Sequence, residues 1–438
     1  MYSVIKPSVV AAMLMAASAL AAQEPAPADS ISTPADQLLQ SIEDSRLRSL
    51  VAETLERNPG VAVLQARARA AASRGPQVRG LPDPVVGATA WLQGAETRTG
   101  PQILTLNVMQ PLPWLGRFDA AEKGAVLEAR ALFAEAEALR LELVTSVRRL
   151  YYELAFLARQ RAVSEDFLDH LRQHEKISLS RYATGTGSTQ DVIKIQAETT
   201  LAEKLLLDID RRRIALEADL NALRDRSASS AILPAILPSG RAVDLDYRDL
   251  SYQAATRRPE VMAAEARISG AESQVVLAQK QSRPDFAVGL TYTFVDTRQD
   301  AAGQLVPPAG NGDDIVGIQG AISVPIWRQK RSAGVLEATE SGQAAWESKR
   351  VVLAEIEASL GGLLQRIPLT WRQIRLLEDV LVLQAGESVR SAQSSYVSGT
   401  LNALDLLDAE HVLFEAETAI ARTLADYAIY LAELEGAV

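Results

Sequence analysis

The chain has 438 residues and a formal net charge of −10, from 55 acidic and 45 basic side chains. This acidic balance argues against nucleic acid as the main partner, because phosphate binding needs a basic surface. The absence of cysteine excludes a disulfide framework, a thiolate site and a lipidated N-terminal cysteine. The length allows two or three globular domains, or one extended and duplicated one.

The first residues have the pattern of a secretory signal. Lys6 precedes an apolar run from Val9 to Leu20, and Ala19-Leu20-Ala21 fits the small-x-small rule for cleavage. A membrane-spanning helix needs about 20 apolar residues, so this run is too short to be one. We expect a signal peptide over residues 1–21, an exported chain, and a flexible lead-in over residues 22–45.

Proline divides the rest of the chain into two similar halves. Prolines crowd the segment from Pro59 to Pro113, and none occurs from Trp114 to Leu233. The second half repeats this arrangement, with Pro368 alone after residue 325. Because proline breaks a helix interior at a cost of about 3 kcal/mol, the two proline-poor tracts can form long helices. We expect Pro368 to kink or locally unwind the second tract.

Apolar residues in both tracts recur every three or four positions, which predicts helices that lie nearly parallel to their neighbours. We expect one antiparallel helical hairpin over residues 118–224 and another over residues 330–433. The first helix, from Phe118 to Arg181, would be roughly 95 Å long at 1.5 Å per residue, too long for a compact domain. The periodic positions are Leu143, Val147, Leu150, Leu154 and Leu157, and then Leu353, Ile356, Leu360, Leu363, Ile367, Trp371 and Ile374.

The proline-rich segment of each half carries a pair of predicted strands. Apolar residues alternate there with small or polar ones over about ten residues, which is typical of transmembrane β-barrels, although ordinary half-buried hairpins alternate too. Recurrence at matching places of both halves favours the membrane interpretation. The strands are expected over residues 84–92, 103–112, 286–294 and 315–326, and the first half alternates Leu104, Leu106 and Val108 with Thr105 and Asn107.

Four strands are too few to close a barrel, for which about eight is the practical minimum. In lipid every strand edge must be paired, so strands in a membrane would require an oligomer, and three chains would supply twelve strands. Trp114 and Trp327 each follow the second strand of a pair. We expect them to be membrane-interface aromatics, since indole rings favour that depth, although a core position suits tryptophan equally.

A short motif occurs twice, at an offset of 214 residues. Its glycine can take the left-handed conformation that ends a helix, and a capping residue then starts the returning helix. The duplication predicts two structural repeats, over residues 46–240 and 241–438, each with a strand pair and a helical hairpin. The motifs are Tyr182-x-x-Gly185-Thr186 and Tyr396-x-x-Gly399-Thr400, followed by the caps Ser188 and Asn402 and, three residues later, by Asp191 and Asp405.

With these motifs the chain resembles the TolC-type outer-membrane efflux family. The resemblance covers about residues 50–434 and rests on the duplication, on both turn motifs and on an ordered set of short sequences around proline. That set is Asn58-Pro59 and Arg258-Pro259, Pro82-Asp83 and Pro284-Asp285, and Leu112-Pro113-Trp114 and Val324-Pro325-Ile326.

The resemblance implies a mainly α-helical homotrimer with a 12-stranded transmembrane β-barrel in the outer membrane of a Gram-negative cell and an α-helical barrel in the periplasm. It implies an exit duct without cofactor or catalysis, which passes small molecules or metal cations from an inner-membrane transporter. A periplasmic adaptor would contact the turns. The turn residues carried over are Tyr182, Gly185, Thr186, Tyr396, Gly399 and Thr400.

The second turn continues as Asp405-Leu406-Leu407-Asp408, which resembles the acidic constriction of the family. Capping alone also explains Asp405. It does not explain Asp408, whose counterpart in the first turn is Lys194, and which would otherwise be a solvated surface carboxylate. In a trimer the two positions would place six carboxylates around one axis and favour cations.

Other candidate sites are weaker. His170 and His174 have the i, i+4 spacing of some zinc sites, but only Glu175 is near in sequence, so a polar helix face is preferred. The Gly-Thr-Gly-Ser-Thr run at 185–189 lacks the residue order of a phosphate loop. The arginines at 211–213 are expected to be solvated, and we find no spacing of nucleophile, base or paired carboxylates that suggests catalysis.

Three alternatives remain open at this point: a periplasmic adaptor, a secreted coiled-coil scaffold and an exported enzyme. An adaptor should have one hairpin and many more short strands, and an enzyme should show a site. The exported substrate is not readable. Two segments, Leu81-Pro82-Asp83-Pro84 and Gln110-x-x-Pro113-Trp114-x-Gly116-Arg117, resemble the metal-cation branch of the family, with drug or other small-molecule export as the competing interpretation.

Overall fold

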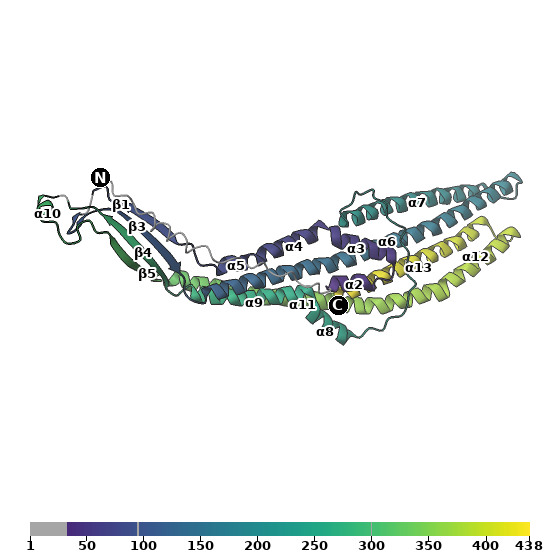
Figure 1. Cartoon of the computed structure of the whole chain (residues 1–438). Coiled ribbons are helices and arrows are strands. Elements are labelled where there is room, and N and C mark those ends of the chain that lie inside the picture. The colour runs from purple at the N-terminus through teal and green to yellow at the C-terminus, as the bar shows by residue number, and fades with distance from the viewer. Residues whose placement is uncertain (1–32, 94–95, 299) are drawn as a thin grey trace.

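The computed structural model describes residues 33–93, 96–298 and 300–438. The molecule is elongated, with a β-sheet at one end, two helical turns at the other and long helices between them (Figure 1). The expected signal peptide lies outside the described residues. In the described part of the chain, no helix is both long enough and apolar enough to cross a membrane.

The same order of elements occurs twice, which agrees with the duplication read from the sequence. Each half has two helices that meet at a proline, two strands and then a long helical hairpin. The first half comprises α3 (Ser45–Arg57), α4 (Pro59–Ala72), β1 (Val85–Ala90), β3 (Gly100–Leu112), α6 (Arg117–Ala183) and α7 (Thr189–Leu223). The second comprises α8 (Tyr247–Arg257), α9 (Pro259–Lys280), β4 (Asp285–Val295), β5 (Ile315–Ser323), α11 (Arg328–Leu376), α12 (Val382–Val397) and α13 (Ala403–Ala437).

Four antiparallel strands form one sheet in the order β1-β3-β4-β5. The central pairing of β3 with β4 joins the two halves, with Val108 opposite Leu290. Strands β1 and β5 are the edges of this sheet. A two-residue strand, β2 (Glu96–Thr97), pairs with the start of β3 in the loop region, and a short helix, α10 (Ala301–Leu305), lies in the β4–β5 loop.

The two hairpins lie side by side as a row of helices, α7–α6–α13–α12 (Figure 1). Helix α6 has 67 residues and is therefore roughly 100 Å long at 1.5 Å per residue. Between α6, α7 and α13 the row is held by a buried apolar cluster of Phe156, Leu157, Ile209, Ala421 and Ala425. Helices α7 and α12 are the edges of the row, as β1 and β5 are of the sheet.

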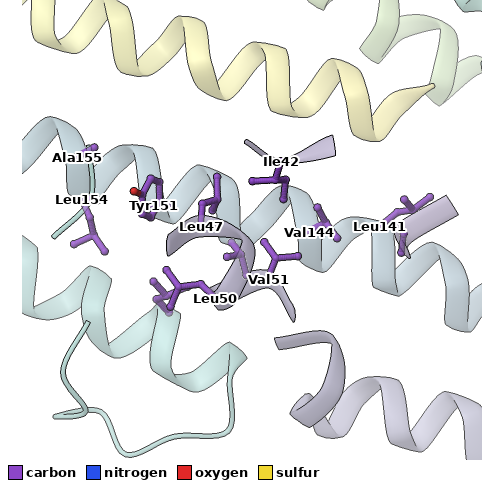
Figure 2. Close-up of a cluster of buried hydrophobic side chains, with 13 residues drawn as sticks. Ile42, Leu47, Leu50, Val51, Leu141, Val144, Tyr151, Leu154 and Ala155 are labelled. Atoms are coloured by element: carbon purple, nitrogen blue, oxygen red, sulfur yellow. The ribbon is translucent and has the colours of Figure 1, made fainter. Parts of the chain in front are cut away.

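At the base of the first hairpin, short helices pack across α6. Leu47 and Val51 of α3 lie against Val144 and Tyr151 of α6 (Figure 2). The hydroxyl of Tyr151 donates to Asp44 Oδ2 at 2.5 Å, and burial together with this bond raises the pKa of Tyr151 well above its usual value. The contact fixes the start of α3 on the long helix.

The expected flexible lead-in over residues 22–45 is ordered in its later part. Helix α2 (Pro34–Ser41) begins at a Thr33 cap and packs on α6, with Ala35 fully buried. Arg140 of α6 donates to Asp36 at 2.6 Å. Composition suggested flexibility, but a long-range ion pair and apolar burial hold this segment in place.

The expected break at Pro368 is not where the helix becomes irregular. Helix α11 runs through Pro368, and a π-helical turn, η2 (Leu377–Leu381), follows before α12. Ile367 and Ile374 flank the proline and are both buried in one apolar cluster. We attribute the continuity of α11 to this packing, which outweighs the loss of one backbone hydrogen bond.

Candidate functional site: the sheet faces and the hairpin turns

The strand register separates apolar from polar side chains. Leu290 lies opposite Val108 on one side and Ile318 on the other, whereas Thr291 lies between Asn107 and Gly317 on the opposite face. Many apolar side chains of this sheet are exposed in the single chain, and soluble proteins rarely expose so large an apolar patch. The apolar face comprises Val86, Ala88, Ala90, Leu104, Leu106, Val108, Leu112, Phe286, Val288, Leu290, Tyr292, Phe294, Val316, Ile318 and Ile322.

The junction between sheet and helices explains one of the repeated proline motifs. Asp285, at the start of β4, accepts the Trp114 backbone N–H at 3.0 Å and an Arg117 N–H at 3.2 Å. The Trp114 ring stacks on Phe286 with centroids 6.1 Å apart. Trp327 lies at the corresponding junction before α11 and is 72% exposed. Both tryptophans thus lie where strand becomes helix.

The two turns, named here the first tip (residues 182–191) and the second tip (residues 396–405), have matching backbones. Gly185 and Gly399 have φ of 74° and 80°, which confirms the expected left-handed conformation. The Thr186 N–H and hydroxyl both donate to the Arg181 carbonyl, at 2.9 and 3.2 Å. In the second tip Thr400 donates both groups to the Ser395 carbonyl at 3.0 Å. Each threonine therefore satisfies a carbonyl that the helix end leaves open.

The expected caps are also present. Ser188 Oγ accepts the Asp191 N–H at 3.1 Å, and Asn402 Oδ1 accepts the Asp405 N–H at 2.9 Å. These bonds start α7 and α13. The geometry thus gives the backbones of Asp191 and Asp405 the same structural role in the two tips.

The two tyrosines of the motifs differ sharply. Tyr182 is 52% exposed, whereas Tyr396 is 4% exposed. Arg181 of α6 lies over the Tyr396 ring, 4.2 Å from its centroid, and donates to the Tyr396 carbonyl at 2.7 Å. The second tyrosine is therefore covered by the first hairpin, while the first tyrosine faces outward.

Asp405 and Asp408 are both exposed and lie three residues apart, on one face of α13. Two residues further, Glu410 is only 3% exposed and points toward α6, where its Oε1 lies 2.8 Å from His174 Nε2. The expected polar face for His174 is therefore wrong, since its side chain is 12% exposed and lies between the hairpins. Among the described residues no three His, Asp or Glu side chains are placed to hold a metal ion.

A further contact between the hairpins was not visible in the sequence. Arg422 of α13 donates two hydrogen bonds to Glu153 of α6, at 2.7 and 2.9 Å, and its guanidinium lies over Phe156. Burial opposes the charge of Arg422, but the bonds to Glu153 and Asp426 raise its pKa above the usual value. Its partner Glu153 is 269 residues away, so no local pattern marked it.

An apolar-faced sheet joined to a row of helical hairpins, with both layers open at two edges, defines the class of elongated channel subunits. The chain belongs to the family described as "Outer membrane efflux protein", which matches residues 50–224 and 250–438. The resemblance inferred from the motifs is thereby confirmed.

Known relatives are distant in sequence and close in fold. "Nodulation protein T" of Rhizobium leguminosarum bv. trifolii is 22% identical over 385 residues, which cover 82% of this chain and 77% of that protein. The crystal structure of the outer membrane protein VceC of Vibrio cholerae is 23% identical, with a TM-score of 0.76 over 93% of this chain and 98% of that one. The channel protein CusC is 16% identical, with a TM-score of 0.73 over 95% and 99%.

Proposed function

We propose that three copies of this chain form the outer-membrane exit duct of a tripartite efflux system, which passes small molecules or metal cations from an inner-membrane transporter and a periplasmic adaptor to the exterior. One observation carries the proposal: the sheet and the helical row are both open at two edges, β1 with β5 and α7 with α12. A second copy can close each edge.

The sheet supports both the membrane location and the number of copies. In lipid the outward N–H and C=O groups of β1 and β5 must be bonded, so β5 of one copy pairs with β1 of the next. Two copies would give eight strands, and side chains fill the interior of a barrel of that size. Three copies are the smallest number that leaves a lumen. The apolar face then meets lipid, and Asn107, Thr291 and Gln319 line the interior.

The helical row supports the same assembly. Exposed apolar side chains on α7 follow a seven-residue repeat at Ile193, Leu207 and Ile214, which are 60%, 71% and 60% exposed. The other edge carries a matching stripe. Such stripes pack helices of neighbouring chains in coiled-coil manner, which closes an α-helical barrel. The second stripe is Leu369, Leu376 and Leu383, which are 61%, 61% and 62% exposed.

The sheet offers the experiment that tests the duct. Ile318→Arg puts a charge on the lipid face and should cost about 2–4 kcal/mol, which removes heat-modifiable trimers from the outer membrane. Its neighbour Gln319→Arg puts the same charge on the interior face and should leave the trimers intact while changing ion selectivity in planar bilayers. Wild-type protein that fractionates as soluble chains, or an equal effect of the two variants, would end the proposal.

At the tips we assign two roles. Tyr182, Gly185, Thr186, Gly399 and Thr400 form the exposed surface that an adaptor would contact. Tyr396 is buried beneath Arg181, so it supports this surface from inside and does not contact the adaptor itself.

Asp405 and Asp408 form the constriction in this proposal. They are exposed on one face of α13, and in a trimer six carboxylates would surround the axis and favour cations. Replacing both with alanine should lower the preference for cations and raise single-channel conductance. The matched control is Asp191→Ala with Lys194→Ala in the first tip, which should change neither property. Unchanged selectivity in the second-tip variant would remove the constriction from the proposal.

A further inference from the structure

One contact between the two hairpins contains a group that titrates near neutral pH. His174 of α6 and Glu410 of α13 approach to 2.8 Å, eight residues before Tyr182 on the first hairpin and five residues after Asp405 on the second. The other polar contacts along this seam use arginine, as in Arg148 with Glu435 and Arg422 with Glu153. Arginine keeps its charge at all physiological pH values, whereas histidine does not.

The surroundings of the pair are mostly apolar. Glu410 is 3% exposed, and both Glu410 Oε2 and His174 Nδ1 are buried without a hydrogen-bond partner among the described residues. Helix α7 contributes Ile195 and Ala202 to the cluster around this place. The titratable groups that face the pair are His170 of α6, with Nδ1 3.9 Å from Glu410 Oε1, and Tyr396 of α12, whose ring meets the His174 ring edge-on.

The protonation of this pair bears on its stability. With neutral His174 and ionised Glu410, the closed seam buries a net negative charge on a carboxylate that has one hydrogen-bond donor, which is unfavourable. One added proton makes the pair neutral overall and removes that cost. When the hairpins separate, water can solvate both groups and the cost disappears in either state. The closed arrangement therefore binds this proton more tightly, so lower pH favours closure and higher pH favours separation.

The repeated architecture indicates that the fold itself does not require the pair. The positions that match His174 and Glu410 in the other repeat hold Ser388 and Gln196. Gln196 is exposed and bonds Glu175 within the first hairpin. The same backbone is thus built in one repeat without a buried ionisable pair, and the pair adds a property that the other repeat lacks.

We propose that His174 and Glu410 form a proton-dependent latch between the two hairpins, which holds the tips together in acid and releases them as pH rises through neutrality. The inference rests on the proposed duct, since the latch controls how readily the tips part. It gives the duct a means to stay closed when the compartment around its tips is acidic.

The first test measures full-length protein in planar lipid bilayers between pH 6 and pH 8. The open-state population of the wild type should rise at least about threefold over this range, within the limit of about tenfold per pH unit that a single proton allows. Glu410→Gln keeps the shape and removes the ionisable group, so its open-state population should be flat. Glu415→Gln is the matched control, since Glu415 pairs with His411 at 3.1 Å on the exposed side of α13 and should leave the wild-type slope unchanged.

The second test does not depend on conduction. The chain lacks cysteine, so Gln190→Cys and Val397→Cys allow spin labels at the two tips, and labelled chains diluted into unlabelled ones report distances within one copy. The distance distribution should widen from pH 6 to pH 8 in the wild type and not in the Glu410→Gln background. Absence of channels with a pH-dependent distance would overturn the duct and keep the latch. Channels whose pH response survives Glu410→Gln, or pH-independent distances, would overturn the latch.

Discussion

The two tips have nearly the same backbone and different neighbours. Both use a left-handed glycine, a threonine that caps the helix end and a polar side chain that starts the returning helix. These features depend only on residues within the turn, so duplication preserves them. The differences lie in side chains that reach the other hairpin or the surface, which duplication leaves free to change.

Four positions carry most of this difference. Three of them concern the contact between hairpins and one concerns the exposed face of α13. The comparison teaches that the shared residues build the turn, whereas the unshared residues decide how the second tip is held. The pairs, with the residue at the matching position of the other tip second, are Arg181 and Ser395, His174 and Ser388, Glu410 and Gln196, and Asp408 and Lys194.

The largest effect is expected at an unshared position. Arg181→Met removes the bond to the Tyr396 carbonyl and the contact with its ring, and should lower the stability of the closed tip by about 2 kcal/mol. Hydrogen exchange at the Thr400 and Leu401 amides measures this. Arg172→Met, which breaks an exposed pair with Glu203 on the same helix, should have little effect. Equal exchange rates in the two variants would contradict the comparison.

A smaller effect, equal in the two tips, is expected from the shared glycines. Gly185→Ala and Gly399→Ala should each cost about 1.5 kcal/mol, because both residues have positive φ although no atom crowds them. Gly386→Ala, in the uncrowded interior of α12, should instead stabilise by about 0.5–1 kcal/mol. Thermal unfolding compares the three. A cost at one tip only would show that the shared geometry is not needed in both.

The caps should matter slightly less. Ser188→Ala and Asn402→Ala each remove one side-chain acceptor and should cost about 1 kcal/mol. Hydrogen exchange at the first amides of α7 and α13 locates the loss. Substitution of Gln190, which is exposed beside the Ser188 cap, provides the control and should leave exchange unchanged. If Asn402→Ala opened the channel while Ser188→Ala did not, the cap in the second tip would have a gating role.

The smallest effect at neutral pH concerns Glu53, which has Gln253 at the matching place of the second repeat. Burial opposes its charge, but bonds from Arg224 and Arg226 at 2.8 and 2.6 Å lower the pKa of Glu53. A lowered folded-state pKa gives stability that is present above the ordinary pKa and lost as pH falls through the folded value.

Glu53→Gln should therefore destabilise at pH 7, by no more than about 1 kcal/mol, and approach the wild type in acid. Denaturant titrations from pH 7 to pH 3 measure the convergence. The exposed Glu56→Gln is the control, and should run parallel to the wild type at every pH. A constant difference between Glu53→Gln and the wild type would mean that packing, and not charge, causes the loss.

Local and periodic features were predictable from the sequence. The tip glycines, their caps, the long helices and the paired strands each follow from spacing that a few residues define. Contacts between distant segments were not. His174 and Glu410 lie 236 residues apart, and Asp36 and Arg140 lie 104 apart, so neither partner marks the other. The π-helical turn after Pro368 was also missed, because packing around the proline moved the irregularity along the helix.

The open edges of the sheet have a consequence for biogenesis in the proposed duct. A single copy would carry the unbonded outward groups of β1 and β5 into lipid, at a cost of several kcal/mol for each group. Membrane entry and association are therefore one event. A newly exported chain would have to wait in water, with its apolar sheet face shielded by other proteins, until two sister chains arrive. Expression level should then set the rate of insertion more steeply than in proportion.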